Sequence, residues 1–255
     1  MEFITSEAFD PSLLLALFFV ALFAGFIDAV AGGGGLLTIP ALLLAQVPPI
    51  QALATNKLQA SFGTFSAAMT MVKRGQVNLK QLRITLLYCF IGAVLGTWLV
   101  QISSPEWLEY IVPFVISVIC FYFLFAPNPG EVEANPRVSE KSWQRFFVPT
   151  LGFYDGYLGP GAGMFYTLGA VALRGRELIQ ATANAKVLNL TSNLASLVIF
   201  VLGGNVVWVL GLAMLIGQLI GGNLGAHAVL KGGARFIRPV IVVVCLCMLA
   251  KNLIV

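Results

Sequence analysis

Charged side chains are scarce in this sequence. Only 10% of its 255 residues are Asp, Glu, Lys or Arg, whereas a soluble domain carries about 25%. Hydrophobic residues make up 58% of the chain, and the mean hydropathy is +0.90. A soluble fold with so little charge could not cover its surface, so the composition predicts an all-α polytopic membrane protein in a lipid bilayer.

The residue types that perform catalysis or hold cofactors are also few. The one histidine, His227, lies in a Gly/Ala-rich apolar segment, which favours structural packing over a proton relay. No Gly-Lys-Ser/Thr follows either glycine-rich stretch, so neither is a nucleotide loop. We therefore expect no enzyme, cofactor, metal site or nucleic-acid partner. The four cysteines lie in apolar segments without metal-ligand spacing and are interpreted as packed thiols: Cys89, Cys120, Cys245 and Cys247.

Two glycine-rich stretches interrupt the apolar runs, and in each an acidic residue precedes the run of glycines. The first, Gly25–Pro40, contains Asp28 and the four consecutive glycines Gly32–Gly35. The second, Gly152–Met164, repeats the G-F-x-D pattern at Asp155, 127 residues (155 − 28) after the first. This offset is about half the chain length and indicates an internal duplication. A carboxylate within an apolar segment requires a partner or a proton.

The hydrophobic segments of the two halves come in the same order, a glycine-broken hairpin and then three spans. The predicted first repeat covers residues 11–126, a polar cytoplasmic linker covers 127–145, and the second repeat covers 146–254. The expected segments are Pro11–Gln46 (hairpin), Ile50–Val72, Ile84–Ile102 and Trp107–Ala126, then Phe146–Leu173 (hairpin), Leu178–Leu202, Val206–Leu230 and Arg235–Ile254.

Basic residues predict how these segments are oriented. The positive-inside rule places basic loops in the cytoplasm. Because three spans is an odd number, the two halves are then inverted, with about eight spans in total and both termini on the outer side. Whether the hairpins are re-entrant or fully spanning stays open. Inverted repeats with interrupted helices are typical of transporters. Twelve of the 15 basic residues lie in four loops: Lys73, Arg74, Lys80, Arg83; Arg137, Lys141, Arg145; Arg174, Arg176; and Lys231, Arg235, Arg238.

A polar cluster opens the first span after each hairpin. Lys57 and Lys186 lie seven and eight residues into their spans, so we expect both near the middle of the bilayer. A lysine at that depth costs about 2.5–3.5 kcal/mol and needs a compensating anion. The proposed polar ligands around the two lysines are Thr55, Asn56, Gln59 and Ser61 in the first cluster and Asn184, Asn189 and Asn193 in the second.

Three interpretations of the buried charges compete. In the first, the lysines, the amides and the backbone N–H groups at the glycine breaks (Gly33, Gly34 and Gly161) form a cradle for a small anionic substrate. In the second, Asp28 and Asp155 neutralise the lysines as structural ion pairs. In the third, an aspartate takes up a proton when a lysine takes the substrate, which couples transport to protons. The sequence does not separate the first from the third.

Long paired motifs resemble one family. G-F-I-D-A-V-A-G-G-G-G-L-L-T-I-P, A-L-A-T-N-K-L-Q-A, G-F-Y-D-G-Y-L-G-P-G-A-G and A-T-A-N-A-K-V-L-N-L-T-S-N are similar to motifs of the sulfite exporter TauE/SafE family, from about Leu13 to Lys251. The resemblance implies a bacterial inner-membrane protein of about eight spans that exports sulfite or a sulfur-containing organic anion.

Together these features predict a secondary transporter, an exporter of a small organic or sulfur-containing anion. Lys57 and Lys186 would hold the anion, and Asp28 and Asp155 would pair with them or carry protons. The alternatives are an anion channel and a non-transporting membrane scaffold. A homodimer is compatible with the sequence, and nothing in the sequence identifies the substrate or the coupling ion.

Overall fold

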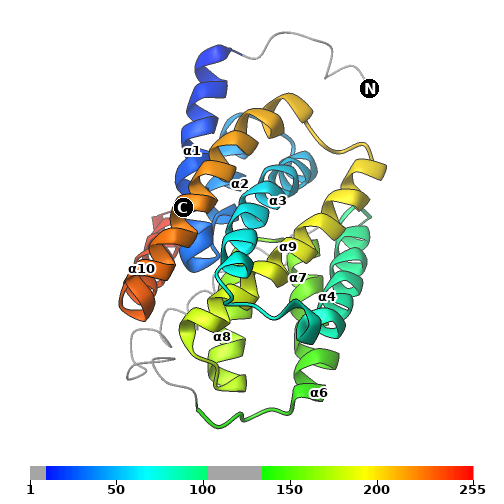
Figure 1. Cartoon of the computed structure of the whole chain (residues 1–255). Coiled ribbons are helices and arrows are strands. Elements are labelled where there is room, and N and C mark those ends of the chain that lie inside the picture. The colour runs from blue at the N-terminus through cyan, green and yellow to red at the C-terminus, as the bar shows by residue number, and fades with distance from the viewer. Residues whose placement is uncertain (1–9, 103–133, 255) are drawn as a thin grey trace.

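The computed structural model describes residues 10–102 and 134–254, and no strand occurs within these two ranges (Figure 1). The all-α class is therefore confirmed. The predicted span Trp107–Ala126 lies outside the described residues. The helices are α1 (Pro11–Ala31), α2 (Gly35–Leu44), α3 (Pro49–Lys73), α4 (Leu79–Val100), α6 (Glu140–Ser142), the π-helical turn η1 (Trp143–Phe147), α7 (Val148–Tyr157), α8 (Ala162–Arg174), α9 (Leu178–Leu202) and α10 (Trp208–Ile254).

Four stretches of helix in the described part of the chain are long and apolar enough to cross a membrane, namely α1, α4, α9 and residues 208–233 of α10. Helix α3 has the same length as α9, 25 residues. It is less apolar because the predicted polar cluster lies within it. Helix α10 has a non-helical residue at Gly233, where the sequence predicts the loop between Leu230 and Arg235. The eight-span count, the inverted orientation and the three domain boundaries stay predictions.

Both hairpins break at the predicted glycines. Helix α1 ends at Gly32, whose φ is +87°, and α2 begins three residues later. Helices α7 and α8 are separated by Gly159 and Gly161, with φ of +95° and +78°. Glycine adopts these left-handed conformations without the steric cost of a Cβ. With ten residues, α2 is about 15 Å long, half the thickness of the hydrocarbon core, so it cannot span the bilayer alone.

The start of α1 is fixed by a cap outside the apolar segment. The Asp10 carboxylate accepts hydrogen bonds from the Ser12 hydroxyl at 2.7 Å and the Ser12 backbone N–H at 2.9 Å. These bonds, with the hydroxyl contributing most, hold the pKa of Asp10 below its ordinary value. Pro11 occupies the first helical turn, where its missing N–H is not needed.

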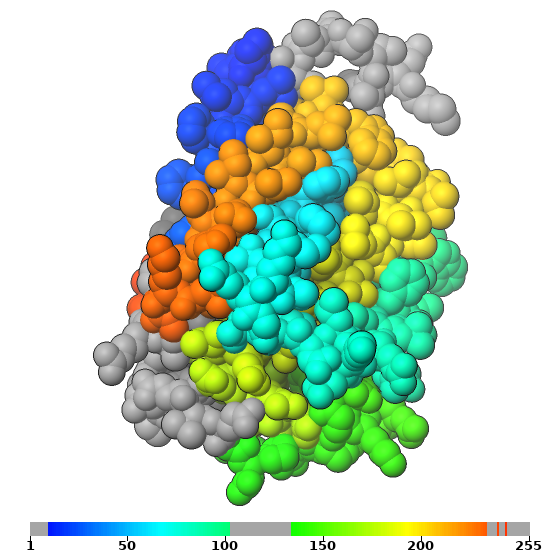
Figure 2. Space-filling view, in the orientation of Figure 1, coloured from blue at the N-terminus to red at the C-terminus, as the bar shows by residue number. Residues whose placement is uncertain are grey.

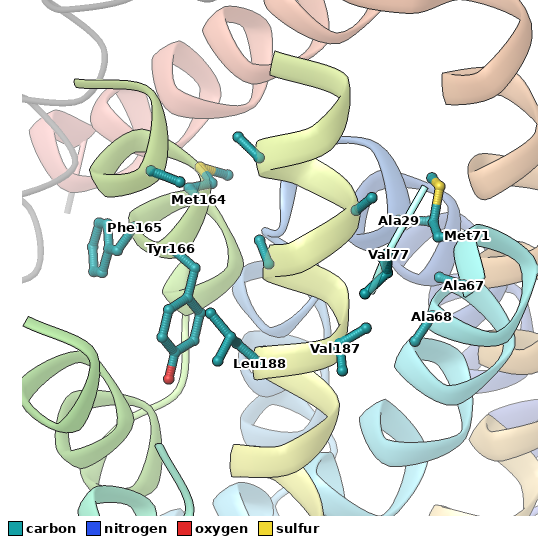
Figure 3. Close-up of a cluster of buried hydrophobic side chains, with 14 of the residues drawn as sticks. Ala29, Ala67, Ala68, Met71, Val77, Met164, Phe165, Tyr166, Val187 and Leu188 are labelled. Atoms are coloured by element: carbon teal, nitrogen blue, oxygen red, sulfur yellow. The ribbon is translucent and has the colours of Figure 1, made fainter. Parts of the chain in front are cut away.

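Helices α3 and α9 lie side by side at the centre of the fold. Figure 1 shows α1 and α10 on one side of this pair and α4 and α7 on the other. The buried cluster in Figure 3 joins small side chains of α1 and α3 to larger ones of α8 and α9, among them Ala29, Ala67, Tyr166 and Leu188. Helix α3, the most polar of the long helices, is therefore surrounded by other helices of the protein.

The outer surface of the long helices is apolar. Phe23 of α1, Trp98 of α4 and Ile216 of α10 are each more than half exposed. Figure 2 shows α3, α4, α9 and α10 packed into one continuous face. Such extensive exposed apolar surface would be a liability in water and is normal for a protein surrounded by lipid.

Glycine rows bring α1 against α10 and α4 against α7. On α10 a glycine occurs about once per turn, at Gly217, Gly221 and Gly225. A Cβ at each of these positions would lie less than 3.0 Å from a backbone carbonyl oxygen of α1. The α4–α7 pair is equally close, since Gly96 and Gly156 face backbone of the opposite helix. Small residues permit this approach of helix backbones in membranes.

The backbone contact at Gly221 predicts a selective effect of added volume. We expect Gly221→Ala to lower the thermal unfolding temperature of the purified protein, because its Cβ would meet the Leu22 carbonyl oxygen of α1. Gly211→Ala on the same helix is the matched control, since its Cβ would meet the flexible Leu58 side chain. Equal unfolding temperatures for the two variants would contradict tight backbone packing of α1 on α10.

Candidate functional site

The two glycine breaks meet each other inside the fold. A Cβ added at Gly163 would lie 2.6 Å from the Cα of Gly32, so the two backbones pass without room for a side chain. A Cβ at Gly35 would lie 3.4 Å from the Asn56 amide nitrogen and 3.6 Å from the Cα of Pro160. The breaks of both hairpins therefore converge beside the polar cluster of α3.

Lys57 is enclosed by groups from the other half of the chain. Its Nζ donates to Asp155 Oδ1 of α7 at 2.6 Å and to Asn193 Oδ1 of α9 at 3.0 Å, and its side chain is 1% exposed. The second oxygen of Asp155 accepts a hydrogen bond from the Ser192 hydroxyl. A buried ion pair with this many hydrogen bonds has its charges well compensated.

Lys186 forms the equivalent pair in the opposite direction, and more loosely. Its Nζ donates to the backbone oxygen of Asp28 and lies 4.0 Å from Asp28 Oδ2. Asp28 Oδ1 accepts from the Gly34 N–H at 3.1 Å, so the carboxylate is held by the first glycine break. Each lysine thus pairs with the aspartate of the other half. Lys57 and Asp28, which belong to the same half of the chain, do not form an ion pair with each other.

The other candidate residues of α3 make bonds within the protein. Asn56 Oδ1 accepts from Thr38 Oγ1 at 2.6 Å and from Gln59 Nε2 at 2.7 Å. Gln59 Oε1 is buried and has no hydrogen-bond partner among the described residues. Thr55 accepts from the N–H of Val207 at 3.1 Å. The Ser61 hydroxyl donates to the backbone of its own helix, one turn earlier, at 2.7 Å.

The candidates of α9 separate into two groups. Asn189 Oδ1 accepts from Asn193 Nδ2 at 3.4 Å, which links Asn189 to the Lys57 pair. Asn184 instead lines a pocket with Arg174 and Arg176. At the breaks, Gly33 accepts a backbone bond from Leu36 and Gly161 accepts one from Met164. Which of these groups touch a substrate stays a prediction.

Three residues near the lysines were not among the predicted site residues. Ser192 binds Asp155, Thr38 binds Asn56, and the Tyr154 hydroxyl donates to the Pro160 backbone oxygen at 2.6 Å. Ser192 follows Asn189 by three residues, so its position on the polar face was a usable signal. Thr38 and Tyr154 had none, because their partners are set by how the hairpins fold.

The one histidine of the sequence, His227, lies in α10. His227 Nδ1 is 2.9 Å from the backbone oxygen of Asn223, one turn earlier on α10. This contact is local to the helix. It fits the packing interpretation of the histidine.

The chain as a whole is similar to known membrane proteins. The family model described as Sulfite exporter TauE/SafE matches residues 17–252. The chain belongs to the TauE/SafE family. No solved structure is a significant match to it.

Several curated relatives support this membership. The chain is 46% identical to the "Probable membrane transporter protein YfcA" of Escherichia coli (strain K12) over 244 residues, 96% of this chain and 91% of that protein. It is 45% identical over 239 residues to a "Probable membrane transporter protein" of Haemophilus influenzae, 94% of both chains. A more distant relative, YdhB of Bacillus subtilis, is 22% identical over 217 residues. This TauE/SafE chain is thus a membrane transporter, and its relatives' names point to transport and not to catalysis.

Proposed function

We propose that this TauE/SafE chain is a secondary transporter that exports a small organic or sulfur-containing anion of the sulfite or sulfonate class. The observation that carries the proposal is the pair of fully buried lysines, Lys57 and Lys186, where the two helix breaks meet. Ammonium groups beside broken helices are suited to a compact oxyanion. The family name, sulfite exporter, supports the same class of anion.

The architecture we propose is an inverted repeat in a bacterial inner membrane, with eight spans and both termini outside. Reciprocal packing supports it. Helix α1 packs on α10, and α7, which occupies the corresponding place in the second half, packs on α4. The lysine pairs are reciprocal in the same way, from α3 to α7 and from α9 to α1. The basic loops favour the stated orientation.

The transport step we propose is an exchange of carboxylate for substrate at the lysines. Asp155 holds the Lys57 ammonium in this structure, so a bound anion must displace that carboxylate. A displaced carboxylate left charged in a low-dielectric interior costs several kcal/mol. Uptake of a proton by Asp155 removes this cost. The site is then neutral both with the ion pair and with a monovalent anion plus a proton.

Co-binding of anion and proton has a measurable consequence. Because a monovalent anion and its proton carry no net charge, their movement is insensitive to the membrane potential. The direction follows the anion gradient and the pH gradient. An anion channel behaves in the opposite way, since its flux carries charge and follows the potential.

Efflux from proteoliposomes tests the proposal. Vesicles loaded with methanesulfonate, sulfite, thiosulfate or acetate are diluted into anion-free buffer, with the potential clamped by potassium and valinomycin. We expect a sulfur oxyanion to leave with protons, so that the luminal pH rises at a rate independent of the clamped potential. Flux that follows the potential while the luminal pH stays constant would favour a channel. The variant Lys57→Met/Asp155→Asn keeps the site neutral and is expected to lose at least about tenfold in flux; parental flux in this variant would refute the lysine cradle.

A further inference from the structure

A second cluster of cationic and polar groups lies away from the lysine pairs. A pocket of about 50 Å³ is lined by α4, α6, η1, α8 and α9. This is room for about three to five water molecules, or for one compact oxyanion. Its lining includes Thr85 of α4, Arg174 at the end of α8, Arg176 in the turn that follows, and Asn184 of α9.

One polar group in this pocket has no partner. Thr85 is 1% exposed, and its Oγ1 makes no hydrogen bond within the described residues. Buried hydroxyls are normally hydrogen-bonded, and an unpaired one requires an explanation. A hydroxyl can donate to an anion while neighbouring guanidinium groups supply the countercharge. The orphaned hydroxyl therefore points to a ligand with acceptor oxygens.

Arg174 already binds a carboxylate at the rim of this pocket. Its Nη2 lies 2.6 Å from Glu140 Oε2, and its Nη1 donates to the Val138 backbone oxygen. The Glu140 side chain is 51% exposed, whereas that of Arg174 is 12% exposed. An ion pair with an exposed partner contributes little to stability, so a competing oxyanion can replace Glu140 on Arg174 at low cost.

The inner end of the pocket lies close to the proposed transport site. Tyr166 and Leu188 line it. The Tyr166 hydroxyl is 3.1 Å from Cys89 Sγ. Ser192, one turn beyond Leu188 on α9, binds Asp155. From Asn184 to Ser192 the rise along α9 is about 12 Å. The pocket and the Lys57–Asp155 pair therefore lie beside successive turns of α9, the second through Ser192.

We propose that this pocket is a second anion site, which captures a compact oxyanion through Arg174, Arg176 and Thr85 before the anion reaches Lys57. The class of ligand rests on the proposed function, whereas the existence of the site rests on the unpaired Thr85 hydroxyl and the flanking arginines. The positive-inside rule puts this arginine-bearing end of α8 in the cytoplasm. The site would then set the affinity for anion on that side alone.

Initial-rate transport of sulfite in vesicles of defined orientation tests this site. The variant Arg174→Gln/Glu140→Gln removes the ion pair without changing the net charge, and Thr85→Val removes only the unpaired hydroxyl. We expect the half-saturating sulfite concentration on the cytoplasmic side to rise about tenfold in the first variant and about threefold in the second. The maximal rate and the half-saturation on the opposite side should not change.

Controls separate this site from the lysine cradle and from general surface charge. Lys141→Gln removes an exposed positive charge from the same α6 segment that bears Glu140. If it raises the half-saturating sulfite concentration as much as the paired variant does, the effect is not specific to Arg174 and the site is refuted. Parental half-saturation in both pocket variants also refutes the site, while the proposed function stands. If the parent protein does not transport sulfite, titration of the purified parent and Arg174→Gln/Glu140→Gln proteins with sulfite tests the pocket, and equal affinities or no binding refute the site.

Discussion

Replacing Lys57 with methionine is expected to destabilise the folded protein by about 3–5 kcal/mol, because Asp155 would stay buried without its countercharge. Within residues 10–102 and 134–254, the side chains that bind this carboxylate are Lys57 and Ser192, and Lys57 is the cation of the two. Thermal unfolding of the purified protein in detergent measures the loss. The destabilisation would be among the largest that a single substitution produces.

A second change in the same chain gives the decisive comparison. Asp155→Asn removes the unpaired charge and keeps an acceptor for Ser192, so Lys57→Met/Asp155→Asn should recover most of the lost stability. The matched cycle is Lys186→Met with Asp28→Asn, where Nζ and Oδ2 are 4.0 Å apart and not 2.6 Å. We expect a smaller coupling energy there. Additive effects in the Lys57 cycle would show that Lys57 and Asp155 are not energetically paired.

Gly32→Ala is expected to prevent correct assembly of the two hairpins. The residue combines a φ of +87° with a Cβ position less than 3.0 Å from the backbone of Gly163. Left-handed backbone costs an L-residue roughly 1–2 kcal/mol. In addition, the new Cβ would clash with Gly163 and would force the α7–α8 hairpin to move away. We predict little monodisperse protein in size-exclusion chromatography and no anion transport by what remains.

Gly75→Ala is the control that introduces the backbone strain of a left-handed alanine without a steric contact. Gly75 has a φ of +73°, yet nothing lies within 4 Å of its Cβ position. This variant should cost only the conformational strain, and it should assemble and transport. If Gly32→Ala behaves like Gly75→Ala, the meeting of the two breaks is not required for assembly.

The sequence predicted those features that depend on residue type and on position along a helix, namely the helix breaks and the buried lysines. Glycine-rich motifs predicted both helix breaks, because they recur at matching positions after the aspartates of the two G-F-x-D patterns. The loop predicted between Leu230 and Arg235 corresponds to a kink in α10 at the single non-helical residue Gly233. Burial of Lys57 and Lys186 followed from their depth along long apolar helices.

Partner choice could not be predicted from the sequence. Two lysines and two aspartates allow two pairings, and only the packing of α7 on α4 and of α1 on α10 brings Asp155 to Lys57 and Asp28 to Lys186. Asn184 is two residues from Lys186 but faces another pocket, since adjacent positions of a helix point in different directions. Spacing thus predicts a face, and tertiary packing decides which side chains meet.

The reciprocal packing of α1 on α10 and of α7 on α4 also bears on biosynthesis. Among the described helices, α1 has its main neighbour in α10, which is synthesised after the other described helices, so α1 must wait in the bilayer with its glycine-facing side covered only by lipid. Neither half can complete its packing before the other is inserted. The chain therefore behaves as two interlocked pieces, whose assembly is dominated by contacts between residues far apart in the sequence, a topology that makes folding slow.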